Sequence, residues 1–400
     1  MVFSDPSTSG LIISYIIPLT GMTGAFFFPM TMLAKSAVSL QRLAEYVNWN
    51  HFEKPFDTPK PEDTNWPLTG DVEAVNLSVK YRKELPLVLE GINFKIKSGE
   101  KVGIVGRTGS GKSTTLLCLM RILEMAKDES GSPLGYVTVD GQRIDQIGLH
   151  QLRNKLAIIP QDPFLFEGSL RQNIDPMGLA TDEDIIAALK EVSVMDTINA
   201  EEIIEQKVKQ IKEDELVKFR KLPKNEKIEI KEAYKSARNY ISSTLQTEEI
   251  PEIKQLRERG ASDMDKLNYM IEERGSNLSV GQRQLICIAR AVVKRPRILL
   301  MDEATANIDQ KTDAIIQSFI KERLGGTTVI TIAHRLITII QYDKLLIFDR
   351  GTKAEEGTPL ELIQKGGYFA KLVEEGGKEF KAKMIRAAKN HDLDPAVLFG

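Results

Sequence analysis

The sequence predicts an α/β fold that is built around a phosphate-binding loop and preceded by one transmembrane helix. Three observations on the 400-residue chain carry this prediction. No charged residue occurs from Ser7 through Ala34, and the acidic pair Asp302 and Glu303 ends a short apolar stretch of strand type. A glycine-rich loop separates another strand pattern from a helix pattern, and it consists of Gly106, Arg107, Thr108, Gly109, Ser110, Gly111, Lys112, Ser113 and Thr114.

The N-terminal apolar run predicts a helix embedded in a membrane. Gly10 to Leu33 is long enough to cross a hydrocarbon core of about 30 Å. Lys35 and Arg42 follow at once, and the positive-inside tendency then places the downstream side in the cytosol. A cleaved signal peptide is one rival interpretation, although Asp5 stands where a positive region belongs, and a buried helix of a soluble protein is the other.

A linker is expected after this run. Residues 35–47 continue a helical pattern, with Val38, Leu40 and Leu43 alternating with polar positions. Prolines at positions 55, 59, 61 and 67 interrupt regular structure, so residues 50–67 are expected to be extended.

Strand patterns dominate the region around the glycine-rich loop. Residues 71–81 and 87–97 form a first β-rich block, and residues 101–105 form the strand that enters the loop. After the apolar helix pattern of residues 115–120, residues 135–144 and 155–159 are expected to be further strands. The last of these ends in Pro160-Gln161-Asp162-Pro163.

The glycine-rich loop has the composition of a phosphate site. Glycines at 106, 109 and 111 let successive backbone N–H groups point at phosphate oxygens, and the following helix adds its positive N-terminal end. Lys112 is expected to reach the β and γ phosphates, and the Ser113 hydroxyl to coordinate Mg²⁺. The loop therefore predicts a site for a nucleoside triphosphate with Mg²⁺.

A second group of polar residues is expected at the same edge of the sheet. Asp302 follows the strand pattern of residues 297–301 and is positioned to hold Mg²⁺ through its water shell, as an acidic strand end does in other phosphate-loop enzymes. Glu303 is then free to act on the attacking water as general base. The strand pattern of residues 328–332 leads to His334 at this edge, and we expect a functional role for that histidine.

Composition limits the remaining choices. The formal net charge of −2 excludes a general nucleic-acid binder, because such proteins concentrate positive charge against phosphates. The only cysteines are Cys118 and Cys287, which lie in apolar helical patterns and are expected to be reduced core residues.

These residues resemble the nucleotide-binding domains of ABC transporters. Leu278-Ser279-Val280-Gly281-Gln282 is similar to the family's signature sequence, with valine where glycine is commoner. The resemblance implies a P-loop ABC ATPase core with an antiparallel β layer and a helical subdomain. It also implies that Ser279 and Gly281, supported by Gln282, cap the γ-phosphate of ATP held by a partner domain, so that one copy alone cannot complete a site.

Further roles are implied residue by residue. Gln161 resembles the Q-loop glutamine, which touches Mg²⁺ or the lytic water and senses the membrane domains. His334 resembles the switch histidine at the γ-phosphate, and Asp309 resembles the D-loop aspartate that communicates across the dimer. Tyr81 resembles the A-loop aromatic residue, whose ring stacks on adenine.

The resemblance extends to subfamily C, the multidrug-resistance-associated type. Ser169-Leu170-Arg171-Gln172-Asn173-Ile174-Asp175-Pro176 and the run from Glu303 to Asn307 look like its C-terminal nucleotide-binding domain, which usually keeps the catalytic glutamate. The implied organisation is the end of the last transmembrane helix at 1–34, a linker at 35–66, the nucleotide-binding domain at 67–378 and a C-terminal tail at 379–400.

One segment departs from the family pattern. Residues 197–270 include a stretch dense in lysine and glutamate, where the family has a shorter part of its helical subdomain. Ile203, Ile204, Val208 and Ile211 keep helical spacing, and a second helical candidate spans residues 228–245 beyond Pro223. A solvated, partly disordered insertion and a helical hairpin that docks a regulator or the membrane-domain loops both remain open.

The leading functional hypothesis is the ATP-hydrolysing motor of an exporter. ATP and Mg²⁺ are the expected ligands, and the expected partners are a second nucleotide-binding domain, ABC transmembrane domains and a membrane, with no nucleic acid. Pairing of two such domains around ATP would drive substrate transport, and the ATPase domain would lie on the cytoplasmic side of an integral membrane protein. An ATP-gated channel or channel regulator of the same subfamily is the alternative, and a soluble ABC ATPase is the third reading.

Overall fold

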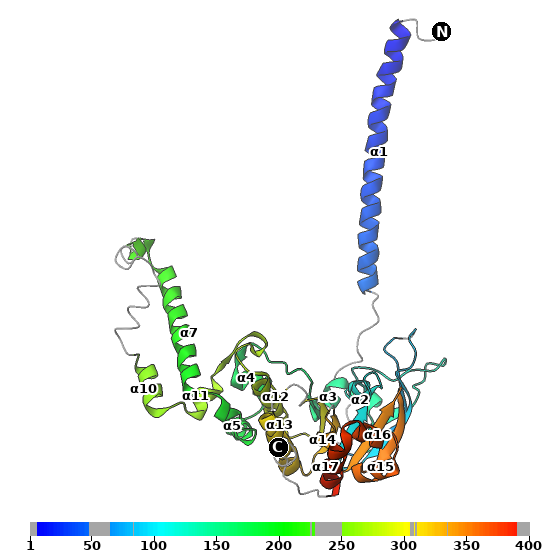
Figure 1. The fold of residues 1–400 in the computed structure, drawn as a ribbon. Helices are drawn as coiled ribbons and strands as arrows, with labels where there is room; N and C mark the ends of the chain where they lie inside the picture. Colours follow the sequence, from blue (N-terminus) through cyan, green and yellow to red (C-terminus); the bar gives the residue numbers. More distant parts are fainter. Residues whose placement is uncertain are drawn as a thin grey trace. The chain divides into compact units, whose positions relative to one another are not determined.

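The computed structural model describes residues 6–47, 65–82, 84–224, 226–228, 250–304, 308, 310–333 and 335–389. It divides the chain into two compact units, Met1–Pro55 and Phe56–Gly400 (Figure 1). The predicted extended linker at 50–67 therefore lies mostly outside the described residues.

The first unit contains one long helix, α1 (Pro6–Val47). Its 42 residues correspond to about 63 Å at the usual rise per residue, which is more than the roughly 30 Å of a membrane's hydrocarbon core. Pro18 and Pro29 lie inside the helix without ending it, so the apolar run and the pattern of residues 35–47 form a single element. Among the described residues, α1 is the one helix long and apolar enough to cross a membrane. Its large apolar side chains, such as Leu11, Phe26 and Leu33, are exposed.

The central sheet of the second unit has six strands in the order β12-β11-β3-β10-β9-β6. The pairs from β11 to β6 are parallel, and β12 is antiparallel at one edge. The strands are β3 (Lys101–Gly106), β6 (Leu156–Ile159), β9 (Ile298–Asp302), β10 (Thr328–Ile332), β11 (Lys344–Asp349) and β12 (Thr352–Gly357). The carboxyl ends of β3, β9 and β10 thus meet at one edge, as the strand patterns predicted.

A second, antiparallel sheet has the order β2-β1-β4-β5. Its strands are β1 (Val72–Val79), β2 (Leu89–Ile96), β4 (Tyr136–Val139) and β5 (Gln142–Arg143). The single strand expected at 135–144 is instead a hairpin, because Asp140 and Gly141 adopt positive φ angles of 49° and 78° and turn the chain. The 3₁₀ turn η1 (Ile144–Gln146) and α3 (Leu149–Lys155) then lead into β6.

One apolar cluster fills the space between the two sheets. It includes Leu77 of β1, Ile96 of β2 and Ile104 of β3, all fully buried. Cys118 of α2 (Lys112–Leu119) is a buried free thiol in this cluster, and Cys287 is a buried free thiol elsewhere, as expected.

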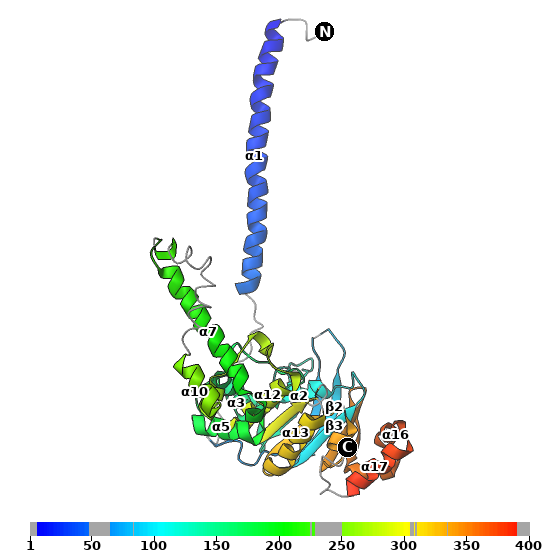
Figure 2. The same ribbon diagram turned by 60° about the vertical axis from the view of Figure 1, so that its left-hand side comes forward.

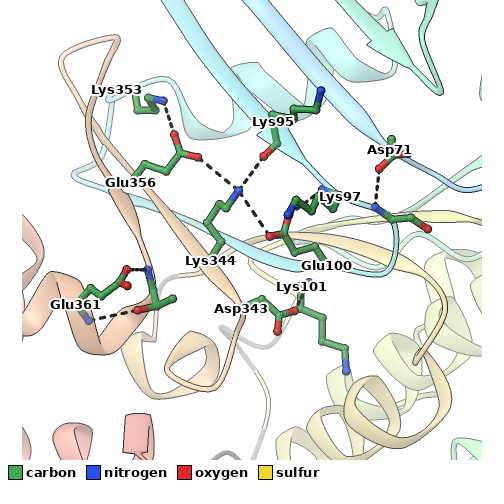
Figure 3. A network of polar contacts seen from close by, with 12 residues as sticks. Asp71, Lys95, Lys97, Glu100, Lys101, Asp343, Lys344, Lys353, Glu356 and Glu361 are labelled. Atoms are coloured by element: carbon green, nitrogen blue, oxygen red, sulfur yellow. Dashed lines mark hydrogen bonds and ion pairs between the residues drawn. The ribbon is translucent and has the colours of Figure 1, made fainter.

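An ion network joins the antiparallel sheet to the edge of the central sheet (Figure 3). The Lys344 ammonium donates to the carbonyl of Lys95 at 2.9 Å and lies within 3.6 Å of Glu100 and 3.5 Å of Glu356. The backbone N–H of Lys101 donates to Asp343 at 2.7 Å. These contacts fix β2, β3, β11 and β12 against one another at the end of the sheet opposite the glycine-rich loop.

A helical subdomain packs around α12 (Val280–Lys294), which Figure 2 shows among its other helices. The residues of α12 from Leu285 to Ala289 are all buried. The other elements are α4 (Leu170–Ile174), α5 (Asp182–Glu191), α6 (Val194–Thr197), α7 (Ala200–Lys221), α10 (Pro251–Arg259), α11 (Asp263–Leu267) and the 3₁₀ turn η2 (Glu273–Gly275). A two-stranded sheet of β7 (Gly168–Ser169) and β8 (Met270–Ile271) lies among them.

The charge-dense insertion begins with a regular helix. Helix α7 follows the predicted spacing, with Ile203 buried and Ile204, Val208 and Ile211 partly exposed, and it ends just before Pro223. Residues 200–221 thus form the first of the two helices that the spacing predicted. The second helical candidate, residues 228–245, lies outside the described residues except at Ile228.

The C-terminal helices cover the edge formed by β11 and β12. They are α14 (Leu336–Ile339), α15 (Pro359–Lys365), α16 (Tyr368–Glu375) and α17 (Gly377–Lys389). Helix α13 (Gln310–Arg323) packs elsewhere, and its Ile316 and Phe319 belong to the apolar cluster of α12. Phe369 and Met384 are fully buried in one cluster with Leu345 and Ile347 of β11. The boundary expected before residue 379 thus falls inside α17.

Candidate functional site

The glycine-rich loop connects the end of β3 to the start of α2 and allows little change of side chain. Gly109 and Gly111 have φ angles of 81° and 97°, which L-residues with a side chain rarely adopt. A Cβ on Gly111 would lie 2.3 Å from Leu89 Cδ2, and one on Gly106 would lie 2.3 Å from the Phe348 carbonyl oxygen. Glycine is therefore required by space at 106 and 111, and by backbone conformation at 109 and 111.

The Lys112 ammonium folds back over the loop. It donates to the carbonyl oxygens of Gly106 at 2.9 Å and of Arg107 at 3.1 Å. Burial lowers the pKa of Lys112 from its ordinary value, while the charges of Glu303 and Asp302 oppose that shift. A cation is thus held over a loop of backbone amides, which is the arrangement that a phosphate group fits.

Ser110 supplies a further sign that the loop accommodates an anion. Its side chain is buried, and its hydroxyl has no hydrogen-bond partner in the described part of the chain. A buried donor without a partner is costly, and a phosphate oxygen in the loop would satisfy it.

The hydroxyl of Ser113 and the carboxylate of Asp302 meet at the carboxyl edge of the central sheet. Ser113 Oγ donates to Asp302 Oδ1 at 3.2 Å. Burial raises the pKa of Asp302, the Ser113 hydrogen bond opposes this, and the charge of Glu303 adds to the rise. Burial thus disfavours the charged form of Asp302, and a divalent cation beside the carboxylate would stabilise that form.

These two groups fit Mg²⁺, which prefers oxygen ligands and keeps several of its waters. Among the described residues there is no cluster of three or more His, Cys, Asp or Glu that could hold a metal by itself. Ser113 and Asp302 would therefore hold Mg²⁺ together with phosphate oxygens and water.

Glu303 follows Asp302 in a constrained backbone conformation. Its φ angle is 46°, and its N–H donates to the Ile332 carbonyl at the end of β10 across 3.0 Å. Positive φ at a non-glycine residue stores strain that often marks a functional position. Gln161, which follows β6, donates from Nε2 to Glu303 Oε2 at 3.0 Å.

Tyr81 lies beside the start of α2. Its hydroxyl is 3.2 Å from Thr114 Oγ1, while its side chain is 50% exposed. An exposed tyrosine next to the phosphate loop is available for stacking on a flat ring.

The signature-like residues lie on a different element from the loop. Ser279 is the N-cap of α12, where its hydroxyl accepts from the Gln282 N–H at 3.2 Å and its own N–H donates to Gln282 Oε1 at 2.8 Å. Gln282 also donates to the Thr197 carbonyl at 3.0 Å, and Gly281 lies in the first turn of the helix. None of the described hydrogen bonds or ion pairs links Ser279 or Gln282 to the phosphate loop.

The structure thus brings together five of the predicted residues: Lys112, Ser113, Gln161, Asp302 and Glu303. His334 and Asp309 lie outside the described residues.

Sequence reasoning missed the support that the loop receives from the turn between β11 and β12. Gly351 N–H donates to the Ser110 carbonyl at 3.2 Å, and the Arg107 guanidinium lies 5.8 Å from the centre of the Tyr368 ring. The Arg350-Gly351 pair is the signal of a tight turn here, but nothing in the pattern indicates that the turn contacts the loop.

The sequence profile of the family described as "ABC transporter" matches residues 89–306. "ATP-binding cassette sub-family C member 2" of Rattus norvegicus is 38% identical over 371 residues, which are 92% of this chain and 20% of that protein. "Bile pigment transporter 1" of Saccharomyces cerevisiae is 36% identical over 369 residues, again 92% of this chain and 20% of that protein.

A solved structure described as "Structure of a bacterial Atm1-family ABC exporter with ATP bound" superposes with a TM-score of 0.60 at 26% sequence identity. The match covers 86% of this chain and 48% of that one. The chain spans about one fifth of the length of the curated relatives that it matches. The likeness to subfamily C and the predicted fold class, a P-loop core with an antiparallel β layer and a helical subdomain, are both confirmed. The profile covers more than half of the chain, so the chain belongs to the ABC transporter family.

Proposed function

We propose that this chain is the ATP-binding and ATP-hydrolysing motor domain of an ABC exporter. One observation carries the proposal. Lys112 and Ser113 at the start of α2 face Asp302 and Glu303 at the end of β9, so a phosphate-binding loop and two carboxylates share one edge of the sheet.

ATP binding is assigned to the glycine-rich loop and to Tyr81. The backbone N–H groups from 106 to 114, the Lys112 ammonium and the Ser110 hydroxyl would bind the phosphates, and the Tyr81 ring would stack on adenine. Mg²⁺, when bound between Ser113 and Asp302, would offset negative charge on the phosphate oxygens.

Hydrolysis is assigned to Glu303, with Gln161 and His334 in supporting roles. Glu303 would accept a proton from a water molecule as that water attacks the γ-phosphorus, and the bond between this phosphorus and the ADP oxygen would break. ADP and inorganic phosphate are then the products. The side-chain amide of Gln161 donates a hydrogen bond to the Glu303 carboxylate, so it can orient that carboxylate or the water. His334 would contact the γ-phosphate.

The site is proposed to need a second domain. Ser279 and Gly281 lie at the start of α12 and not on the loop, which suits a role at the nucleotide of a partner. In this arrangement two nucleotide-binding domains pair head to tail around ATP, with Asp309 at their interface. Closing and reopening of the pair would drive transport.

Helix α1 supports a proposal for location. Its length and apolar composition suit the last membrane helix of ABC transmembrane domains, with the ATPase domain in the cytosol. We assign residues 1–34 to the transmembrane domain, 35–66 to a linker, and 67–389, with the charged insertion and all of α17, to the nucleotide-binding domain.

A pair of substitutions tests this function on the full chain in detergent. Glu303→Gln should keep ATP affinity while lowering turnover by roughly 10² to 10⁴, which is typical for the loss of a general base. Lys112→Ala should instead weaken ATP binding, because it removes a cation aimed at phosphate. Near-normal turnover of Glu303→Gln, in a preparation whose nucleotide-binding domains form pairs, would show that Glu303 is not the general base.

A further inference from the structure

The base of the insertion helix α7 is part of the helical-subdomain core. Ile203 is 3% exposed and belongs to the same apolar cluster as Tyr269, Ile271 and Leu278. Figure 1 shows α7 extending away from the group of α5, α11 and α12. The first turns of the charge-dense insertion are thus packed against the segment that leads to Ser279.

One turn further along α7, Gln206 binds the backbone of β8. Its Nε2 donates to the Met270 carbonyl at 2.7 Å, and its Oε1 accepts from the Met270 N–H at 2.8 Å. The opposite edge of β8 pairs with β7, where Ser169 is the partner of Met270 and Gly168 that of Ile271. The Gln206 amide therefore makes the hydrogen bonds that a neighbouring strand would make with β8. It satisfies both the backbone N–H and the backbone carbonyl of the edge residue Met270.

Short polar contacts link β8 to the N-cap of α12. The side-chain amide of Asn277 donates to the Met270 carbonyl at 2.9 Å, and its oxygen accepts from the Glu272 N–H at 3.0 Å. The Met270 carbonyl thus accepts from both Gln206 and Asn277. Asn277 precedes Ser279 by two residues, so the position of β8 is coupled to the start of the signature-like helix.

A second contact supports the same coupling. Lys209 on α7 lies 3.4 Å from Glu272, and the Glu272 carboxylate accepts from the Ser276 hydroxyl at 3.1 Å. Both Lys209 and Glu272 are well exposed, so the pair adds little energy, and the bidentate amide of Gln206 is the main link.

We propose that Gln206 is a positioning residue that holds Ser279 in register through β8 and Asn277. The proposal rests on the function proposed above, in which Ser279 acts on ATP held by a partner. The insertion helix is then a structural support of the signature-like segment, and a change at α7 alters the nucleotide site of the partner and not the loop of its own chain.

Hydrogen exchange of the full chain in detergent tests this inference. Gln206→Ala should speed backbone exchange in residues 276–282 by about three- to tenfold, the range expected from losing one or two hydrogen bonds of modest net strength. Exchange in residues 101–114 should not change. Gln206→Glu loses the donor and sets a carboxylate oxygen against the Met270 carbonyl oxygen, so it should speed exchange in residues 276–282 at least as much as Gln206→Ala does.

Gln210→Ala is the matched control. Gln210 lies one turn further on the same helix, is exposed and forms none of the described side-chain hydrogen bonds. It should leave exchange in residues 276–282 unchanged. Equal exchange in Gln206→Ala and Gln210→Ala would overturn the inference, as would a uniform rise across the whole domain, because that result would mean a general loss of stability.

A mixed pair shows whether the effect acts in trans. One chain carries Ser279→Arg and the other Lys112→Ala, so only the first supplies a working loop and only the second supplies a working signature. Gln206→Ala should lower ATP turnover when it is added to the signature-supplying chain and not when it is added to the other. An equal loss of ATP turnover in both placements would overturn the inference.

The mixture of Ser279→Arg and Lys112→Ala chains without any change at Gln206 tests the proposed function separately. If that mixture does not hydrolyse ATP, head-to-tail pairing of this chain is contradicted, while hydrogen exchange still decides the role of Gln206.

Discussion

The Ser113 hydroxyl donates a hydrogen bond to the Asp302 carboxylate across 3.2 Å, although 189 residues separate the two in the chain. The contact joins the start of α2 to the end of β9 and places an oxygen from each at the edge of the parallel sheet. Because Asp302 has the only carboxylate that Ser113 contacts among the described hydrogen bonds, this pair defines where a divalent cation would be held.

The charge of Asp302 should cost stability when no cation is bound. Burial raises the pKa of this carboxyl, so its contribution to folding is favourable below the ordinary aspartate range and is lost as the pH rises through the folded-state value. Asp302→Asn should therefore raise the unfolding temperature at pH 7.5 in EDTA, and the difference should shrink as the pH falls toward about 4.

Asp128→Asn provides a control of opposite sign. The side-chain hydrogen bond from Ser130 and the backbone bonds of its turn lower the pKa of Asp128, so that variant should unfold at a lower temperature at pH 7.5. An unfolding temperature of Asp302→Asn at or below that of the parent at pH 7.5 would contradict our account of the Asp302 environment.

The Tyr81 ring should contribute to ATP affinity by stacking. Tyr81→Ala should weaken ATP binding by about three- to tenfold, the range for one aromatic contact, and Tyr81→Trp should retain it. Tyr81→Phe removes only the hydroxyl that lies 3.2 Å from Thr114, so it should bind nearly as well as the parent. Calorimetric titration with Mg-ATP measures all three, and equal affinities for the alanine and tryptophan variants would exclude stacking.

Two glycines of the loop separate backbone strain from steric exclusion. Gly109 and Gly111 both have positive φ, but a Cβ on Gly109 meets no heavy atom within 4 Å, while one on Gly111 would lie 2.3 Å from Leu89 Cδ2. Gly111→Ala should therefore lower the unfolding temperature more than Gly109→Ala does, because only the former must also displace a fully buried leucine. The unfolding temperatures of the two variants, measured side by side, test this difference. Equal decreases in unfolding temperature would mean that backbone conformation alone makes glycine necessary at both positions.

Sequence patterns predicted the edge of the sheet well because strands that precede Asp302 and the glycine-rich loop are short, apolar and bounded by polar residues. Parallel pairing then brings their carboxyl ends together whatever the length of chain between them. The apolar run and the helical spacing of residues 35–47 likewise predicted the helix that the structure shows as α1. Pro18 and Pro29 do not end it, because a proline removes only one backbone donor locally.

Other features could not be read from patterns. The contact of Gln206 with β8 depends on which face of α7 meets the subdomain, and a glutamine in a charged stretch gives no sign of that. The support of the loop by Gly351 likewise depends on how two distant turns approach in space. Helical spacing predicted that α7 exists, because Ile203 and its neighbours recur at helical intervals, but not that its base joins the core.

The central claim is that ATP is hydrolysed between the loop of one domain and the signature-like segment of another. The most direct measurement is ATP turnover per molecule of the full chain in detergent as a function of protein concentration, with the oligomeric state followed in parallel. We predict slow turnover at low concentration that rises as pairs form, and a further rise when a first nucleotide-binding domain of the same transporter is added. Fast turnover by a verified monomer, independent of concentration, would contradict the claim.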